Sequence, residues 1–518
     1  MNTKKLIHYA ILVAIIALTY IFPAPTGLSS IGWHLFGVYV ATIVAILLKP
    51  FPLPVILLAG VSVSAIVIGI SPSEKWINIA GISELARWNL LEHTPQQWFE
   101  TLQNQVVKIA LKEDAVLGGY KSGTTWLVFA AFAMSTAFVS TGLGKRIAYL
   151  LIRAFGSTTL RLGYVNACLD LIISPAMPSV TARAGGIIYP IMNSVAVSLG
   201  SDPEKSPRKA GHYLLLNTYM VVKTTGYLFL TAMAPNLLAM NLMEPILHIK
   251  LDWTQWAIAA SVPGLICLFL TPLVIYFIYP PEIRETPDAA VFAHKKLAAL
   301  GKIKRDEWWM LGVFALLLLF WADIPFHLTH ITALKLNPTT TAFLGLGVLL
   351  ISGVLSWGDV TAEKSAWDTL IWFGALVMMA DWLNKLGVVT YFAGQIEGGI
   401  EALALPWFIS MILLALIYLY AHYAFASTTA HISAMLVAFY GAGIALGAPP
   451  LLFGLILAAA GNLMMSLTHY ATGTAPVIFS SNYATLGEWW KAGFVTSIVN
   501  FTVWVAVGLV WWKVMGYY

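Results

Sequence analysis

The chain has 518 residues, of which 59% are hydrophobic and only 10% are charged, with a formal net charge of +5 and a mean hydropathy of +0.79. A soluble domain carries about 25% charged residues, so this composition excludes an ordinary soluble protein and predicts an all-α chain that crosses a membrane many times. The excess of Lys and Arg does not imply a nucleic-acid partner, because the cytoplasmic loops of membrane proteins collect these residues in any case.

Sequence motifs for catalysis or metal binding are missing from the chain. Cys168 and Cys267 lie in separate apolar runs and form neither a CxxC pair nor a disulfide framework. There is no HExxH or GxSxG motif and no His/Asp/Glu set with metal-ligand spacing. His327 and His330 form an H-x-x-H pair, which we interpret as part of a surface loop because a zinc site needs more ligands. We expect no enzyme activity, no metal and no cofactor.

The apolar runs predict about eleven membrane-spanning helices, since a span needs about 20 such residues. The first run follows a charged start and lacks a small-residue cleavage site, so we interpret it as a span that begins inside rather than a removed signal. The predicted spans fall near residues 7–23, 31–49, 51–70, 122–141, 210–240, 254–279, 307–323, 338–356, 366–386, 450–483 and 490–514.

Two further apolar stretches, 145–200 and 403–446, each hold two short arms separated by Pro, Ser, Thr and a charged or titratable residue. We interpret both as re-entrant hairpins that enter and leave the membrane on one side. With this topology 18 of the 29 Lys and Arg residues lie inside and 9 outside, while Arg183 and Lys223 fall at membrane depth. The N-terminus is then cytoplasmic and the C-terminus outside, in the inner membrane of a bacterial-type cell.

The basic loop 281–305 divides the chain into two halves. We expect an N-terminal helix in 1–30, a first repeat in 31–280 with an inner hairpin, a cytoplasmic linker in 281–305, and a second repeat in 306–518 with an outer hairpin. Within the first half, the Trp-containing segment 71–121 is amphipathic, which predicts helices on the outer membrane surface or a partly ordered loop.

Two short blocks recur in the two halves, in the same order. Ser179-Val180-Thr181-Ala182-Arg183 matches Ser427-Thr428-Thr429-Ala430-His431, and each lies in the middle of a proposed hairpin. Downstream, TAMAP (231–235) matches TGTAP (472–476), and each places Ala-Pro inside an apolar span. The offsets, 248 residues from Ser179 to Ser427 and 241 residues from Ala234 to Ala475, are nearly equal. Because the hairpins open from opposite sides, we expect an inverted repeat with its substrate site at the repeat interface.

The residue types at these breaks suit an anion. Ser and Thr cap helix N-termini, whose free N–H groups and partial positive charge favour a carboxylate or a phosphate. Two hairpins supply two such N-termini, a geometry that suits a molecule with an anionic group at each end. The Ala-Pro breaks add Pro235, Asn236, Thr474, Ala475 and Pro476 as candidate contacts.

Three titratable residues at membrane depth are candidate counter-charges for such an anion: Arg183, Lys223 and His431. Each also has a structural alternative. Arg183 could form a fixed internal ion pair, for example with Asp170, or extend to the inner surface; His431 could be a neutral, hydrogen-bonded core histidine. Lys223 could neutralise the same site or extend to the surface.

With these motifs in place, the chain resembles the divalent anion/sodium symporter family. PSVTARAGGIIYPI, STTAHISAM and GTAPVIFSSNY match blocks of its exchanger branch, which includes bacterial citrate/succinate and tartrate/succinate antiporters and the plastid 2-oxoglutarate/malate translocator. The resemblance implies eleven spans, two hairpins and a homodimer. It also implies a scaffold domain (about 1–141 and 306–402) and a transport domain (about 145–280 and 403–518) that moves by an elevator mechanism.

The resemblance also implies that Ser-Asn-Thr motifs at the hairpin tips bind substrate carboxylates and that nearby residues of coupled members hold sodium. These motifs fall on 179–181 and 427–429, where this chain departs from the pattern: Val180 and Thr428 replace the Asn residues. Val180 offers no oxygen to a cation, and a fixed charge on Arg183 disfavours sodium.

We therefore predict a secondary transporter that exchanges C4 or C5 dicarboxylates without sodium, with a sodium-coupled di- or tricarboxylate symporter of the same fold as the alternative. Its expected partners are dicarboxylates, the lipid bilayer and a second copy of the chain. The candidate substrate-binding residues are Ser179, Val180, Thr181, Arg183, Pro235, Asn236, Ser427, Thr428, Thr429, His431, Thr474, Ala475 and Pro476, and the candidate counter-charges are Arg183, Lys223 and His431.

Overall fold

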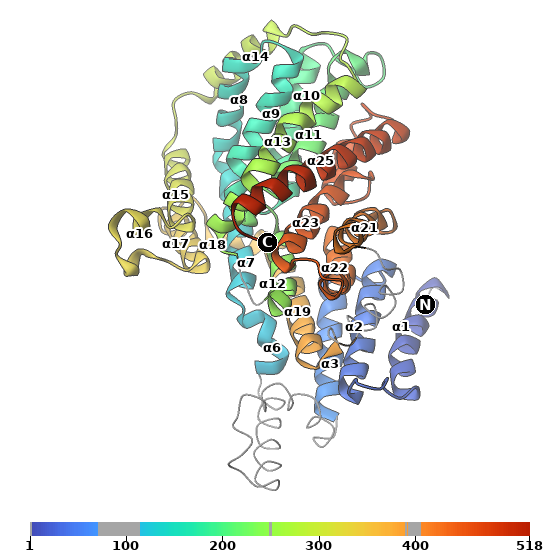
Figure 1. Ribbon diagram of the computed structural model, residues 1–518. Coiled ribbons are helices and arrows are strands. Elements are labelled where there is room, and N and C mark those ends of the chain that lie inside the picture. Colours follow the sequence, from blue (N-terminus) through green and yellow to red (C-terminus); the bar gives the residue numbers. More distant parts are fainter. Residues whose placement is uncertain (1–2, 71–113, 248–250, 389–390, 392–405) are drawn as a thin grey trace.

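The computed structural model describes residues 3–70, 114–247, 251–388, 391 and 406–518 (Figure 1). Within these ranges the regular structure is helical, apart from one isolated bridge between Thr158 and Glu285. The predicted all-α class is confirmed. Most of segment 71–121, including the residues with the predicted surface helices, lies outside the described part of the chain.

The first half of the chain contains two groups of helices. The N-terminal group comprises α1 (Thr3–Ile21), α2 (Ser30–Leu48), α3 (Leu53–Ile70), α6 (Asp114–Lys121) and α7 (Gly123–Thr141). The next group comprises α8 (Leu143–Phe155), α9 (Thr159–Ile173), η2 (Ser174–Ala176), η3 (Thr181–Ile188), α10 (Tyr189–Ser198), η4 (Pro207–Lys209), α11 (Gly211–Gly226), η5 (Leu230–Ala232), α12 (Ala234–Leu247) and α13 (Trp253–Ile278).

The second half follows a similar order after the linker helix α14 (Pro287–Leu300). Its first group comprises α15 (Arg305–Trp321), α16 (Ile324–Thr329), η6 (Thr332–Leu334), α17 (Pro338–Ile351), α18 (Trp357–Ala362) and α19 (Lys364–Lys385). Its second group comprises α21 (Trp407–Tyr420), η7 (Ala421–Ala424), α22 (Thr428–Ala445), α23 (Pro450–Leu463), η8 (Met464–Ser466), α24 (Thr474–Phe479) and α25 (Leu486–Val514).

Each predicted span corresponds to one helix or to one broken helix. Among the described residues, six helices are long and apolar enough to cross a membrane, and four shorter apolar helices, such as α17, accompany them. The two spans predicted to carry Ala-Pro are each split: 210–240 into α11, η5 and α12, and 450–483 into α23, η8 and α24. Pro cannot donate an intrahelical hydrogen bond, and it stands at the second position of α12 and the third of α24, where none is needed.

The elements of the two halves interleave in space. One packed group holds α1, α2, α3, α6, α7, α15, α17 and α19, and a second holds α9, α10, α11, α13, α23 and α25. The two groups meet where α12 and α22 pack against α19 and α2 (Figure 1). The Tyr39 hydroxyl of α2 donates to the Ser433 carbonyl of α22 across this boundary. Helices far apart in the sequence therefore build both groups.

Each predicted hairpin contains two helical arms joined by a short irregular tip. In the second, α21 and α22 pack against each other, joined by η7. In the first, α9 is one arm and the other is η3, a wide π-type helix, continued by α10. The segment 145–155, which we assigned to this hairpin, instead belongs to the separate amphipathic helix α8. The described hairpin begins at Thr159, after its N-cap Thr158.

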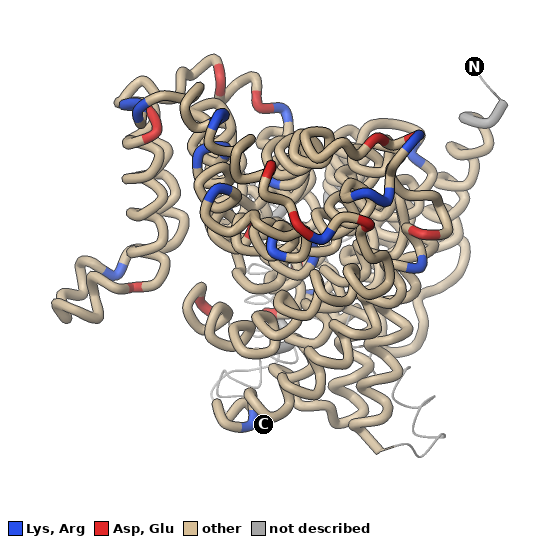
Figure 2. Tube along the Cα trace, turned by 90° about the horizontal axis from the view of Figure 1, so that it is seen from above, with Lys and Arg blue, Asp and Glu red and all other residues tan. Residues whose placement is uncertain are grey.

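The basic linker 281–305 is ordered. Its helix α14 packs along α8, and the chain before it is fastened to the turn between α8 and α9, where Thr286 N donates to Ser157 O at 2.9 Å and Thr159 N to Arg284 O at 2.9 Å. Figure 2 looks down on this end of the molecule and shows charged residues of both signs around it. The linker therefore forms one layer with α8, at one end of the helices.

Candidate functional site

The tip of the first hairpin contacts the broken spans of both repeats. The Ser179 hydroxyl accepts a hydrogen bond from Ala182 N at 3.1 Å, as the predicted helix cap requires. Ala234 N, at the break of the first repeat, donates to Pro178 O at 3.4 Å. The Thr181 and Thr474 hydroxyls lie 3.1 Å apart, which joins the tip to the break of the second repeat. The tip motif of the first hairpin therefore contacts the Ala-Pro breaks of both repeats.

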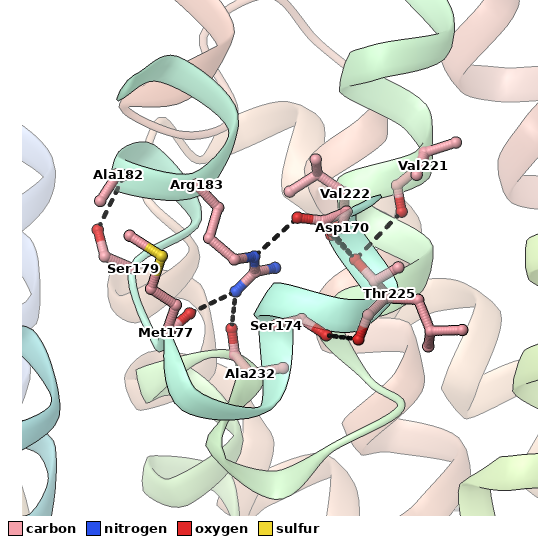
Figure 3. Close-up of polar contacts among 11 residues, drawn as sticks. Asp170, Ser174, Met177, Ser179, Ala182, Arg183, Val221, Val222, Thr225 and Ala232 are labelled. Atoms are coloured by element: carbon pink, nitrogen blue, oxygen red, sulfur yellow. Dashed lines mark hydrogen bonds and ion pairs between the residues drawn. The ribbon is translucent and has the colours of Figure 1, made fainter. Parts of the chain in front are cut away.

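Arg183 is buried behind this tip and forms an ion pair (Figure 3). Its Nε donates to Asp170 Oδ1 at 2.9 Å, and Nη1 donates to the Met177 carbonyl at 2.6 Å and also to the Ala232 carbonyl. The second Asp170 oxygen accepts from the Thr225 hydroxyl. This is the structural alternative for Arg183 that the sequence left open. Only Nη2 of the guanidinium lacks a hydrogen-bond partner among the described residues.

Lys223 lies close to this ion pair on α11 and is 1% exposed. Its Nζ is 4.2 Å from the centre of the Tyr219 ring and has no hydrogen-bond acceptor among the described residues. The Tyr219 hydroxyl in turn donates to Met465 O at 2.6 Å and lies 3.5 Å from Thr472 Oγ1. Tyr219 therefore connects Lys223 to the break of the second repeat.

The tip of the second hairpin has the same cap as the first. The Ser427 hydroxyl accepts from Ala430 N at 3.3 Å. Thr428 is buried with its hydroxyl unpaired in the described structure, and Thr429 is half-buried. His431, the counterpart of Arg183 in the repeat, is fully buried.

His431 is paired with a second histidine, which the sequence reasoning did not identify. The Nδ1 atoms of His422 and His431 are 3.1 Å apart, and His422 Nε2 is 3.2 Å from the Ala471 carbonyl. Because a carbonyl only accepts, His422 carries its proton on Nε2. With both rings neutral, His431 then donates from Nδ1, and its buried Nε2 is a lone-pair acceptor without a hydrogen-bond partner in the described residues.

Asn236, directly after the Ala-Pro break of the first repeat, makes side-chain contacts within and between the repeats. Asn236 donates to Gly226 O at 2.7 Å, and its Oδ1 accepts from Asn462 Nδ2 at 2.7 Å, so its amide joins the two repeats. Ala475 is buried, whereas Pro235 is half-buried and Pro476 is exposed. Val180 is 8% exposed and places an apolar side chain at the tip.

A cavity of about 850 Å³ lies between the two groups of helices. Its walls come from α2, α6, α12, α19 and α22 and are mainly apolar; the charged and amide side chains among them are Lys121, Asn241, Glu244, Asp381, Asn384 and Lys385. Lys385 is paired with Asp381 at 2.7 Å. No group of three or more His, Cys, Asp or Glu able to hold a metal was found in the described residues.

Comparison with known proteins identifies the family of this chain. Residues 3–518 match the family model described as the sodium:sulfate symporter transmembrane region. The chain belongs to this family. It is a membrane transporter family, so the chain is an integral membrane protein rather than an enzyme, and the resemblance inferred from the motifs is confirmed.

Two relatives illustrate the family. The putative malate transporter YflS of Bacillus subtilis is 42% identical over 99% of this chain and 98% of its own length. The chloroplastic dicarboxylate transporter 1 of Spinacia oleracea is 37% identical over 96% of this chain and 79% of its own. The YdaH transporter of Alcanivorax borkumensis, a solved structure at 15% identity and TM-score 0.51, covers 78% of this chain and 88% of its own and shares the fold.

Proposed function

We propose that this protein transports C4 or C5 dicarboxylates across the membrane. Two relatives that match nearly the whole chain carry malate or dicarboxylate in their names. The observation that supports the proposal most strongly is the pair of Ser-capped hairpin tips, with the first joined to both helix breaks. Helix N-termini at such tips favour carboxylates, and two of them suit a ligand with a carboxylate at each end.

We further propose that transport is sodium-independent exchange. Val180 and Thr428 remove the amides that the family motif places at the two tips, and Arg183 and His431 place nitrogen atoms in the interior behind them. Nitrogen donors are poor ligands for a hard cation such as sodium, which prefers several oxygens. A sodium-coupled symporter, in which backbone carbonyls and Thr hydroxyls hold the ion, is the second candidate.

Our proposal for the mechanism and assembly follows the family resemblance. The group of α1–α3, α6, α7, α15, α17 and α19 would serve as the scaffold, and the group with both hairpins would carry the substrate as an elevator-type transport domain. We propose a homodimer in the inner membrane of a bacterial-type cell, with the N-terminus in the cytoplasm and the C-terminus outside, as the distribution of Lys and Arg favours.

Counterflow in proteoliposomes tests this function. Vesicles loaded with malate should take up labelled succinate equally well in sodium and in potassium buffer, and empty vesicles should take up little. A panel of unlabelled C4, C5 and tricarboxylic acids then defines the substrate by competition. Sodium-stimulated uptake into empty vesicles would favour the symporter, and the absence of uptake with every dicarboxylate would contradict the proposal.

A further inference from the structure

Lys223 lies on α11 beside the first hairpin and differs from the buried Arg183 because its Nζ has no carboxylate or other acceptor among the described residues. Both oxygens of Asp170 are occupied, one by Arg183 and the other by Thr225. Arg183 and Asp170 neutralise each other, so the charge of the cluster depends on Lys223 alone. The cluster is neutral when the Lys223 amine has lost its proton and carries +1 when it holds it.

The surroundings of Lys223 contain few charged groups. From the elements packed around α11, Asp170 of α9 and Arg183 of η3 are the charged side chains that act on its ammonium among the described residues, and Tyr219 lies beneath it on the same helix. The Tyr219 hydroxyl lies 3.5 Å from the Thr472 hydroxyl at the second break. Thr472 Oγ1 accepts from Thr474 N at 3.3 Å, and the Thr474 hydroxyl lies 3.1 Å from that of Thr181. An anion bound at this break would therefore lie near an ammonium that contacts the Tyr219 ring and has no hydrogen-bond acceptor among the described residues.

Lysine can release its proton, whereas arginine remains charged in proteins. We propose that Lys223 binds and releases a proton during transport, so that the carrier moves one proton with a dianion when no counter-substrate is present. This inference rests on the proposed dicarboxylate transport. With the dianion bound, Lys223 is an ammonium; in the empty site it becomes a neutral amine and gives its proton to the aqueous side to which the site is open.

This assignment gives a physical reason for coupled exchange. A protonated Lys223 in an empty site is an uncompensated buried charge, which opposes movement across the membrane. Loss of the proton removes this charge, and a bound dianion compensates it, leaving one negative charge for the helix N-termini at the tips. Exchange therefore proceeds when substrate is present on both sides of the membrane. Net transport requires Lys223 to lose its proton, which becomes easier as the pH rises.

The test uses the full chain in proteoliposomes with labelled malate, between about pH 7 and about pH 9, a range in which malate remains a dianion. Exchange is measured with malate on both sides, and net efflux with malate inside only. In the wild type we expect net efflux to rise up to about tenfold per pH unit, the slope for one proton, while exchange changes less than about twofold. An internal pH dye should report one proton leaving with each malate.

Two variants of Lys223 and one control variant distinguish an effect of the Lys223 charge from an effect on the structure. Lys223→Arg, which keeps the charge, should retain exchange with net efflux low at every pH. Lys223→Met should show pH-independent net efflux without proton movement, and its KM for malate should rise at least about tenfold, as expected for loss of one charge-assisted contact. Lys296→Arg is the control, because Lys296 also lies over an aromatic ring, 5.3 Å from the Phe292 centre, but is exposed on α14.

A wild-type net efflux that does not change with pH would overturn the proposal, as would a pH slope that persists in Lys223→Arg or in Lys223→Met. Should Lys223→Arg not fold, the wild-type slope and Lys223→Met still decide the question. Absence of malate exchange in the wild type would instead contradict the proposed function. The two failures are therefore distinguishable.

Discussion

The environment of Arg183 shows how a charged residue is accommodated among apolar helices. Its guanidinium is fully buried and bonded to one carboxylate and two carbonyl oxygens. A buried ion pair adds little net stability, but removal of one partner leaves the other charge without compensation. The structure therefore favours the ion pair with Asp170 as the main role of the Arg183 charge.

Arg183→Met alone should lower the free energy of unfolding by about 3–5 kcal/mol, because the Asp170 carboxylate stays buried without its partner. The double variant Arg183→Met/Asp170→Asn removes both charges and should recover most of this loss. Thermal unfolding in detergent measures the effect. Arg208→Met, which breaks an exposed pair with Glu488, is the control and should cost less than about 1 kcal/mol. A double variant no more stable than the single one would contradict the pairing.

The contact between Thr181 and Thr474 is the point at which the two repeats meet at the first tip. Thr474→Val keeps the shape but removes the hydroxyl and should raise the KM for exchange by about fivefold, equivalent to about 1 kcal/mol for one hydrogen bond. Thr474→Ser keeps the hydroxyl and should behave like the wild type. Initial exchange rates over a range of malate concentrations measure both. If Thr474→Val and the wild type had equal KM values, the contact between Thr181 and Thr474 would not contribute to substrate binding.

At the scale of elements, α14 joins α15 through a short turn that Arg146 holds in place. Arg146 pairs with Glu307 at 2.6 Å and donates to the Gly301 and Lys302 carbonyls at 2.9 and 3.3 Å. Gly301 has φ 68° and ψ −157°, a conformation that only glycine adopts without strain. The linker layer is therefore fixed to the first residues of α15.

Gly301→Ala should lower the free energy of unfolding by about 1–3 kcal/mol, because the new side chain is strained in this conformation. Gly312→Ala is the matched control: Gly312 lies within α15 with open space around it, and alanine there should stabilise the helix by up to about 1 kcal/mol. Thermal unfolding of the two variants should move in opposite directions. A Gly301→Ala protein as stable as the wild type would contradict the strained turn.

The helices could be predicted closely from the sequence because each depends on a local apolar run. The predicted span 122–141 is α7 within one residue, and Ala-Pro marked both broken spans. The repeat also led to Thr181 and Thr474, whose contact the structure shows. His422 was not predicted, because its partner Ala471 is 49 residues away and no local pattern encodes that contact. The sequence prediction placed α8 in the first hairpin, although α8 is amphipathic with Lys145, Arg146 and Arg153 and α9 has no such face.

At the scale of the whole molecule, the cavity between the two helix groups is lined by none of the candidate tip and break residues, although α12 and α22 of its walls begin at the first break and at the second tip. Its walls include the last turns of α6, α12 and α19, which the predicted topology places on the outer side. We infer that this cavity is the outer entrance, and the side from which it can be reached is a direct test of the topology.

Ala438→Cys in a Cys168→Ser background should react with a membrane-impermeant maleimide applied from the outside, and the adduct should block exchange. Ala438 lines the cavity and is exposed, and the other native thiol, Cys267, is buried. Lys296→Cys on α14 is the control and should react only from the cytoplasmic side. Labelling of Ala438→Cys from the cytoplasmic side would reverse the proposed orientation.

The histidine pair of the second hairpin gives the molecule an internal spectroscopic reporter. The Ala471 carbonyl, which belongs to the broken span, fixes the tautomer of His422, and His422 fixes that of His431. Any state in which the break moves away from the hairpin releases both rings to exchange tautomers. Nitrogen chemical shifts of ¹⁵N-labelled histidine should therefore distinguish such states without an attached label, in the same sample that is used to measure transport.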